Sequence, residues 1–315
     1  MTKDSDFSVV IPLYNKVQFI HQALESVLRQ DLAPREILVV DDGSTDGGAE
    51  VVRSRFPTVT LIQQANRGVG AARNNGIASA RSPWVALLDA DDVWAPEHLR
   101  ELQELVGLYP DAGLVSTARA EFAGTKVPSL GFDGHPDRRE IDYFREAARH
   151  SSVVWSSATA VRVAAFDDVG GFGPWPVGED IELWCRIALR YRVAVSDART
   201  AGYRRGVGGV MDTVVAAEDR SVTPMSVRDL GYSAATVADA LATGAARVPK
   251  HSLMRYLDGR VAGKMRSAFA RGEYQRMREL RSLLSSRGLM MAAAPTIISF
   301  LPDRVLERIR KTQLD

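Results

Sequence analysis

The sequence predicts an α/β protein with a mostly parallel sheet flanked by helices, followed by a helical C-terminal region. Apolar strand-like runs alternate with helix-like segments four times in about the first 110 residues. These runs are short and continuously apolar, as expected where helices cover both faces of a parallel sheet. After about residue 225 the chain becomes helical and rich in arginine. We therefore expect a first domain over residues 1–225 and a basic helical region over 226–315.

The first two expected strands both end in polar turns. Residues 7–15, FSVVIPLYN, form a buried run that ends with proline and asparagine. Residues 17–30 follow with apolar side chains at helical spacing, which predicts a helix. Residues 35–44, REILVVDDGS, are a second apolar run that ends in two aspartates. The further elements expected in this half are a helix over 45–56, a strand over 58–64, a helix over 68–80, a strand from Trp84 and a helix from Pro96.

The rest of the chain alternates less regularly. Residues 112–122 and 153–162 are apolar enough for strands, and residues 123–140 are rich in glycine and proline, which favours a loop. A glycine-rich stretch then gives way to a helical pattern within residues 169–191. The helices expected beyond it cover residues 226–243, 250–271, 273–287 and 303–312.

Acidic residues collect where apolar runs end. Asp89 and Asp91 follow the run that starts at Trp84, and strand alternation places both on one side with Ala90 facing away. Their carboxylates suit Mg²⁺ or Mn²⁺, which complete their shell with water and substrate phosphates. Ordinary turn and helix-capping aspartates are the alternative. Asp41 and Asp42 are either turn formers or acceptors for a base or ribose. Because ligands of parallel sheets gather at the carboxyl ends of strands, these acids predict a binding site there.

Two further segments carry candidate residues. Residues 65–76, ANRGVGAARNNG, do not match the dinucleotide fingerprint, because arginine stands at the third glycine position and the segment follows the third strand. Arg73 either supplies a cation to the same sheet edge or lies on a solvated helix face. Glu179 and Asp180 open a helix, where acids favour the helix dipole. A carboxylate at that place is also suited to act as a general base.

Taken together, these motifs resemble the family 2 glycosyltransferases. The resemblance covers about residues 7–205 and depends on six segments in this order: VVIPLYN, ILVVDDGSTD, NRGVGAARNNG, ALLDADDVW, GGF and GEDIELWCRI. It implies a GT-A fold, a Rossmann-like sheet that binds a nucleotide-diphospho-sugar and a divalent cation, Mn²⁺ or Mg²⁺. It also implies an inverting transfer to a hydroxyl of a saccharide or lipid-linked acceptor, with a UDP-sugar as the expected donor and cell-surface polysaccharide or glycoconjugate synthesis as the expected pathway.

The resemblance also assigns roles to residues. Asp180 would be the catalytic base and Asp91 the metal ligand, with Asp89 beside it at the ribose and the metal. The implied nucleotide-sugar contacts are Pro12, Tyr14, Asp41, Asp42, Asn66, Arg73, Asp89, Ala90, Glu179 and Arg204. One departure is visible: GYRRGVGGVM keeps Tyr203 and Arg204 but has no histidine after them, so Arg204 or Arg205 would act at the diphosphate instead.

Charge and composition bound the remaining expectations. Residues 1–225 carry a net charge of −7 and residues 226–315 a net charge of +8. The single cysteine, Cys185, excludes an intrachain disulfide and is typical of a reducing compartment. The longest apolar run, 289–301, is too short to span a bilayer, and no targeting pattern opens the sequence. We expect a cytoplasmic protein, peripheral at the inner face of a membrane.

The basic tail leaves alternatives open. Residues 289–312 combine apolar residues with arginines, which is compatible with an interfacial helix on anionic lipid, with packing on the catalytic domain, or with a homodimer interface. Widely spaced aromatic residues argue against base stacking and therefore against a nucleic-acid partner. Two other functions remain: a nucleotide-sugar-binding scaffold without transfer activity, and an adaptor that binds anionic surfaces through the tail.

Overall fold

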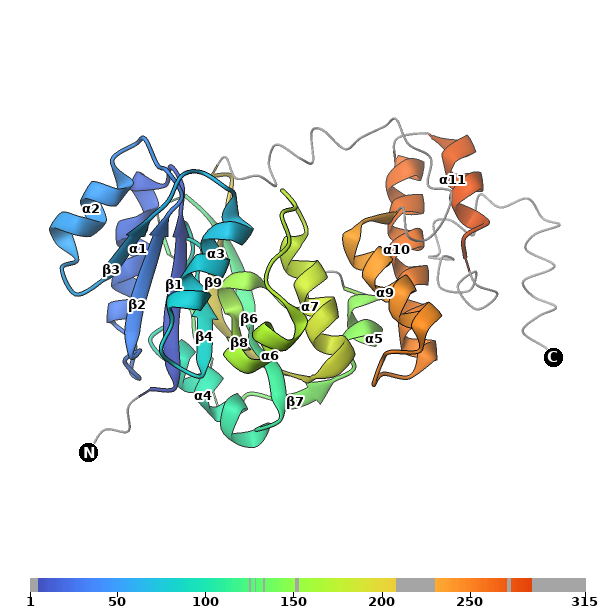
Figure 1. Cartoon of the computed structure of the whole chain (residues 1–315), viewed down its shortest axis with the longest axis horizontal. Coiled ribbons are helices and arrows are strands. Elements are labelled where there is room, and N and C mark those ends of the chain that lie inside the picture. The colour runs from blue at the N-terminus through green and yellow to red at the C-terminus, as the bar shows by residue number, and fades with distance from the viewer. Residues whose placement is uncertain are drawn as a thin grey trace. The chain divides into compact units, whose positions relative to one another are not determined.

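The computed structural model contains one mixed β-sheet with helices on both faces (Figure 1). It describes residues 5–124, 126–127, 129–132, 134–150, 153–207, 230–270 and 273–284. The strands within these ranges are β1 (Phe7–Leu13), β2 (Glu36–Asp41), β3 (Thr60–Gln63), β4 (Trp84–Leu87), β5 (Val93–Trp94), β6 (Ala112–Ala123), β7 (Arg138–Ile141), β8 (Thr159–Arg162) and β9 (Arg192–Arg205). Their order in the sheet is β3-β2-β1-β4-β8-β6-β9-β5, with β7 also paired to β9. The predicted α/β fold class is confirmed.

The helices follow the predicted alternation in the first half of the chain. They are α1 (Val17–Leu28), α2 (Gly48–Arg55), α3 (Val69–Ser79), α4 (His98–Leu108), α5 (Tyr143–Ala147), α6 (Val163–Val169), α7 (Glu179–Arg190), α9 (Tyr232–Thr243), α10 (Lys250–Ala270) and α11 (Tyr274–Arg281), with a 3-10 turn, η1 (Ser156–Ala158). The expected helix 303–312 and the segment 289–312 lie outside the described residues.

The parallel half of the sheet explains why its strands are continuously apolar. All seven residues of β1 are buried, because helices cover both of its faces. Val9 and Ile11 lie in a core that also contains Leu24 of α1 and Leu99 of α4. On the other face α3 comes so close that a Cβ on Gly76 would overlap the side chain of Val10. The glycine in α3 therefore sets a short distance between that helix and β1.

The parallel register brings the polar strand ends to one edge. β1 pairs with β2 so that Leu13 lies beside Asp41, and β1 pairs with β4 so that Val10 lies beside Leu87. The turns after β1, β2 and β4 consequently leave the sheet on the same side. This is the edge at which the sequence predicts a binding site.

The second half of the sheet is mixed and departs from the predicted elements in two places. Of the strand expected over 153–162, only β8 forms. The turn η1 precedes it, and there the hydroxyl groups of Ser156 and Ser157 donate to Asp180 and Asp92. The loop expected over 123–140 ends in β7, a charged strand that pairs antiparallel to β9. β9 also pairs with β5 through Val93 and Gly202, which brings its end to the aspartates after β4.

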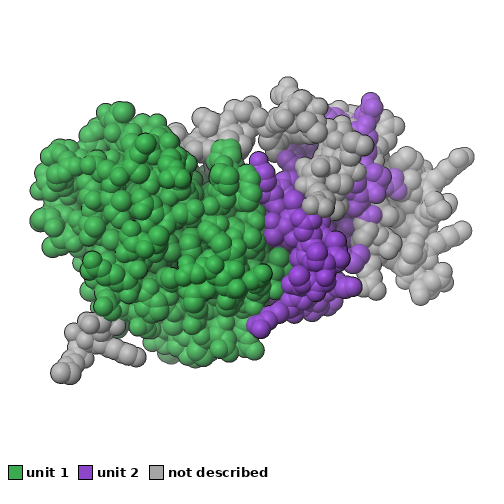
Figure 2. Space-filling model, viewed as in Figure 1, with its two compact units in different colours: residues 1–141, 152–218 green, residues 142–151, 219–315 purple. Residues whose placement is uncertain are grey.

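The chain divides into two compact units, residues 1–141 with 152–218, and residues 142–151 with 219–315 (Figure 2). In the second unit the ring of Phe144 packs edge-on against Tyr256, with centroids 5.6 Å apart. Gly259 of α10 lies against the backbone of Ala148, where a Cβ would be only 2.6 Å from the carbonyl oxygen. The predicted division at residue 225 stays a prediction. No helix within the described ranges is long and apolar enough to cross a bilayer.

Candidate active site

Each of the three aspartates after β4 has its own partners. A guanidinium nitrogen of Arg73 lies 2.7 Å from Oδ1 of Asp89, and Lys16 Nζ lies 2.8 Å from Oδ2 of Asp91. Asp92 is 1% exposed and accepts hydrogen bonds from the Ser157 hydroxyl (2.6 Å) and from the backbone N–H of Arg204 (2.8 Å). The charge of the first two acids is therefore balanced by cations of the protein itself.

Burial shifts the pKa values in this turn. It raises the pKa of Asp91, the negative charge of Asp89 adds to the rise, and the ion pair with Lys16 opposes it. Burial also raises the pKa of Asp92 well above its ordinary value, with the charges of Asp89 and Asp91 acting in the same direction. Three carboxyl groups at one strand end therefore disfavour one another's ionisation unless positive charge is present.

Arg73 connects the aspartate turn to the start of α7. One of its nitrogens donates to Asp89 and the other donates to Glu179 Oε1 at 2.8 Å, and its side chain is 4% exposed. Burial alone would lower the pKa of this guanidinium, but the charges of Asp89, Glu179 and Asp180 more than offset it, and the pKa is raised. The Cζ atom of the guanidinium lies over the ring of Phe172, 5.3 Å from the ring centroid. The solvated-face alternative for Arg73 is therefore wrong.

Glu179 and Asp180 occupy the first turn of α7, as the sequence predicts. Burial raises the pKa of Glu179, while Arg73 opposes the rise. Asp180 is only partly buried; its Oδ2 accepts from the Ser156 hydroxyl at 3.0 Å and its Oδ1 from the N–H of Ile181 at 2.7 Å. A carboxylate held in this way can still take up a proton from a ligand hydroxyl.

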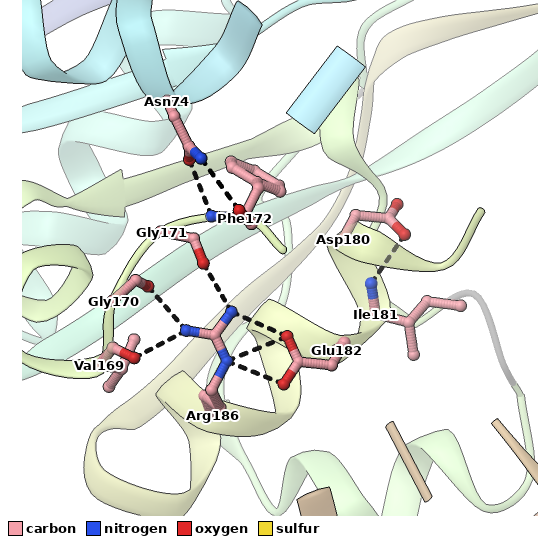
Figure 3. A network of polar contacts seen from close by, with 9 residues as sticks. All are labelled: Asn74, Val169, Gly170, Gly171, Phe172, Asp180, Ile181, Glu182 and Arg186. Carbon is pink, nitrogen blue, oxygen red and sulfur yellow. Dashed lines mark hydrogen bonds and ion pairs between the residues drawn. The ribbon is translucent and has the colours of Figure 1, made fainter. Parts of the chain in front are cut away.

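The segment before α7 is fixed to α3 and to α7 by polar contacts (Figure 3). The amide of Asn74 donates to the carbonyl of Phe172 at 2.9 Å and accepts from its N–H at 2.8 Å. Arg186 donates to the carbonyls of residues 169, 170 and 171, and Glu182 holds its guanidinium in place. These bonds attach residues 169–172, which lead into α7, to α3 and to α7 itself.

Asp41, the last residue of β2, and Asp42 after it accept hydrogen bonds from neighbouring segments of the chain. Asp41 accepts from the N–H of Ser44 and from the side chain of Gln63. Asp42 is 3% exposed and accepts from Gln64 and from the N–H groups of Arg67 and Gly68, at 2.8 to 2.9 Å. These bonds fix the loop after β3, and this geometry supports a role in loop structure beside the predicted ligand contacts.

The remaining predicted residues differ in their exposure. Pro12 and Ala90 are buried, whereas Tyr14 is 48% exposed and Asn66 is exposed in the loop that Asp42 holds. Arg204 is 1% exposed and donates to carbonyl oxygens of Asp91 and Gly124 and to Gln22 Oε1 at 2.6 Å. Burial lowers the pKa of Arg204. This setting supports a structural role for Arg204, and its contact to a diphosphate stays a prediction.

Three residues of this site were not found from the sequence: Lys16, Ser156 and Ser157. A lysine in a turn and two serines in an apolar run are common, and only the fold shows that they contact the acids. The serine repeat at the point where the predicted strand 153–162 begins was the one available signal.

The donor atoms in the aspartate turn fit a small divalent cation. Asp89 and Asp91 offer hard oxygen atoms, with side chains 28% and 17% exposed. No group of three or more His, Cys, Asp or Glu in the described ranges could hold a metal ion. Mg²⁺ and Mn²⁺ are held by one or two carboxylates together with substrate phosphates, and Asp89 and Asp91 offer two such carboxylates.

The mixed sheet, with acids at the ends of parallel strands and at the start of a facing helix, is an α/β fold of the GT-A type. A sequence model of the glycosyl transferase family 2 matches residues 8–170, and the chain belongs to that family. The resemblance predicted from the motifs is confirmed.

Curated relatives share the N-terminal part. An uncharacterized glycosyltransferase, alr2836 of Nostoc sp. (strain PCC 7120), is 43% identical over 102 residues, which are 31% of this chain and 32% of the relative. The succinoglycan biosynthesis protein ExoO of Rhizobium meliloti is 42% identical over 147 residues, 46% of this chain and 38% of the relative. The matched parts span about a third of the length of these relatives.

Solved structures share the fold. S. aureus TarS 1-349 in complex with UDP-GlcNAc has a TM-score of 0.64 at 20% identity, over 94% of this chain and 83% of that one. The mannosyltransferase PcManGT from Pyrobaculum calidifontis, in complex with GDP-Man and Mn²⁺, has a TM-score of 0.56 at 18% identity, over 96% and 82%. At these identities the likeness establishes the fold alone.

Proposed function

We propose that this protein is an inverting glycosyltransferase that moves a sugar from a nucleotide-diphospho-sugar, in the first place a UDP-sugar, to a hydroxyl group of a saccharide or lipid-linked acceptor. The observation that carries the proposal is the connection of Asp89 to Glu179 through Arg73, with Asp180 adjacent at the start of α7. It supports the proposal that a metal ligand and a catalytic base lie near each other at one sheet edge.

The mechanism follows from the groups at that edge. Asp180 accepts the proton of the acceptor hydroxyl while the hydroxyl oxygen forms a bond to the anomeric carbon of the donor sugar. The bond between that carbon and the diphosphate oxygen breaks in the same displacement, so the configuration at the anomeric carbon inverts. Glu179, held by Arg73, contacts the donor sugar. A divalent cation bound at Asp91 and Asp89 would neutralise charge on the leaving diphosphate.

Several similarities support the substrate class. The structural neighbours were solved with UDP-GlcNAc and GDP-Man, both nucleotide-diphospho-sugars, and one of them with Mn²⁺. A relative is named for succinoglycan biosynthesis, which favours a role in polysaccharide synthesis. We further propose a cytoplasmic location, contact with a membrane surface through residues 289–312 and a homodimer.

The test is diphosphate release from a panel of UDP-, GDP- and dTDP-sugars, with Mn²⁺, with Mg²⁺ and with EDTA. We expect one donor class to be turned over in a metal-dependent way, and Asp180→Asn and Asp91→Ala to abolish turnover. Asp111→Asn is the matched control, because Asp111 is an exposed acid in the turn before β6. Donor binding without release would favour the nucleotide-sugar-binding scaffold instead.

A further inference from the structure

The side chain of Lys16 forms an ion pair with Asp91, one of the two proposed metal ligands. Its ammonium nitrogen lies 2.8 Å from Asp91 Oδ2, and it also donates to the carbonyl of Val207 at 3.2 Å. The two side chains are 18% and 17% exposed, so the pair is neither fully solvated nor sealed in the core. Lys16 therefore supplies the positive charge that a divalent cation would otherwise bring to Asp91.

The backbone around Lys16 is fixed, which makes this placement a built feature of the site. Asn15 adopts a φ of 50° and accepts from the N–H of Thr45, while its own N–H donates to Ser44. On the other side the N–H of Val17 donates to Asp46 at 2.8 Å. The loop after β2 thus fixes the chain on both sides of Lys16 and leaves only its side chain free to move.

The second cation of the aspartate turn is held differently. Arg73 is 4% exposed and bridges two carboxylates, Asp89 and Glu179. If its guanidinium moved away, both carboxylates would lose their ion-pair partner. Lys16 is a compact charge on a flexible stem and makes one ion pair. Of the two cations that pair with aspartate side chains of this turn, Lys16 has the freedom and the access to solvent that an exchange requires.

We propose that Lys16 is a residue of the metal site. Its ammonium group pairs with the carboxylate of Asp91 when no metal is bound, and a divalent cation displaces the ammonium group from that carboxylate. This inference rests on the proposed function, in which Asp91 is a metal ligand. Two cations a few ångströms apart repel each other strongly in a partly buried site. Binding of the metal therefore requires that the lysine moves away from Asp91.

The test measures the affinity for Mn²⁺ alone, with the full chain and no nucleotide, from the electron paramagnetic resonance signal of free Mn²⁺. Lys16→Met removes the competing charge and keeps the length of the side chain, and Lys16→Arg keeps the charge. Lys250→Met is the matched control, because Lys250 is exposed at the start of α10 in the other compact unit. Asp91→Asn removes the ligand itself.

We expect Lys16→Met to bind Mn²⁺ about tenfold more tightly than the wild type, a factor that corresponds to about 1.4 kcal/mol. Lys16→Arg and Lys250→Met should bind as the wild type does, and Asp91→Asn should cancel the gain in the double variant. An unchanged or weaker affinity in Lys16→Met, including no bound Mn²⁺ in either protein, overturns the proposal.

The same titration separates this inference from the proposed function. It contains no donor, so tighter Mn²⁺ binding in Lys16→Met stands even where no nucleotide-sugar is turned over. Turnover that is lost in Asp180→Asn, together with an unchanged Mn²⁺ affinity in Lys16→Met, would keep the transferase and reject the exchange.

Discussion

Ser156 and Ser157 are neighbours in the chain, and their hydroxyl groups donate to acids from two different parts of the site. Ser156 bonds Asp180 at 3.0 Å, and Ser157 bonds Asp92 at 2.6 Å while accepting from the N–H of Asp89. A single 3-10 turn, η1, therefore fixes the distance between the aspartate turn and the candidate base. A shift of η1 would therefore move the aspartate turn and Asp180 together.

We expect Ser156→Ala to lower kcat about tenfold or more with little change in the donor KM. A hydrogen bond to a charged group is worth about 1.5–3 kcal/mol, and its loss leaves Asp180 free to turn away from the acceptor. Steady-state kinetics with the donor that the diphosphate-release panel selects would measure this. Ser54→Ala is the control, because Ser54 bonds only a helix carbonyl on the surface of α2. A raised KM at constant kcat would contradict a positioning role.

Arg73→Lys should reduce kcat/KM by about tenfold to a hundredfold. Lysine keeps the charge but lacks the planar fork that reaches Asp89 and Glu179 together. Arg73→Met should in addition destabilise the fold by about 3–5 kcal/mol, because it leaves two acids without their cation in a largely buried place. Urea unfolding and kinetics would be measured for both variants. Arg67→Lys is the control, because Arg67 is exposed in the loop before α3. Equal activity of both lysine variants would contradict the bridging role.

His98 makes the stability of the first unit depend on pH. Its ring stacks on Trp94 with centroids 4.3 Å apart, and burial lowers its pKa to about 3. The unfolded chain, with an ordinary histidine pKa of about 6.5, binds a proton between these values and the folded protein does not. Stability is therefore complete above about pH 6.5 and falls as the pH drops toward 3, by at most about 1.4 kcal/mol per pH unit.

The measurement for His98 is the free energy of unfolding in urea at pH 7 and pH 5. Wild type should lose about 2 kcal/mol over this range through His98, and His98→Gln should lack that part of the decrease. His21→Gln, on the exposed side of α1, should keep the wild-type profile. Parallel profiles for wild type and His98→Gln would show that the pKa of His98 does not differ between the folded and the unfolded protein.

Asn74→Ala should destabilise the protein by about 1–3 kcal/mol and lower activity as well. The substitution leaves the N–H and the carbonyl of Phe172 without their partner, and a buried polar group without a hydrogen bond costs about this much. Thermal unfolding and diphosphate release would be measured for this variant and for Asn75→Ala. Asn75 lies on the same helix as Asn74, and its loss removes one hydrogen bond to the side chain of Gln64. Loss of stability with full activity would show that the start of α7 does not depend on this contact.

The sequence was informative where a physical pattern repeats and uninformative where a contact depends on the complete fold. Continuous apolar runs predicted the parallel strands β1, β2 and β4, and the polar residues at their ends predicted the site edge. The strand β7 was missed because its residues, RREI, show no apolar alternation. Arg73 carries no local sign of burial, since its partners Asp89 and Glu179 are 16 and 106 residues away.

Asp42 also has a consequence for the thermodynamics of ligand binding. By accepting bonds from Gln64, Arg67 and Gly68, it holds the loop after β3 through contacts within the chain. Fixing the backbone of a residue costs about 1–2 kcal/mol of conformational entropy, and here that cost belongs to folding. A ligand that reaches Asn66 at the tip of this loop meets a surface that is already rigid. Calorimetry should accordingly show a small entropic penalty for the part of the ligand that this loop contacts.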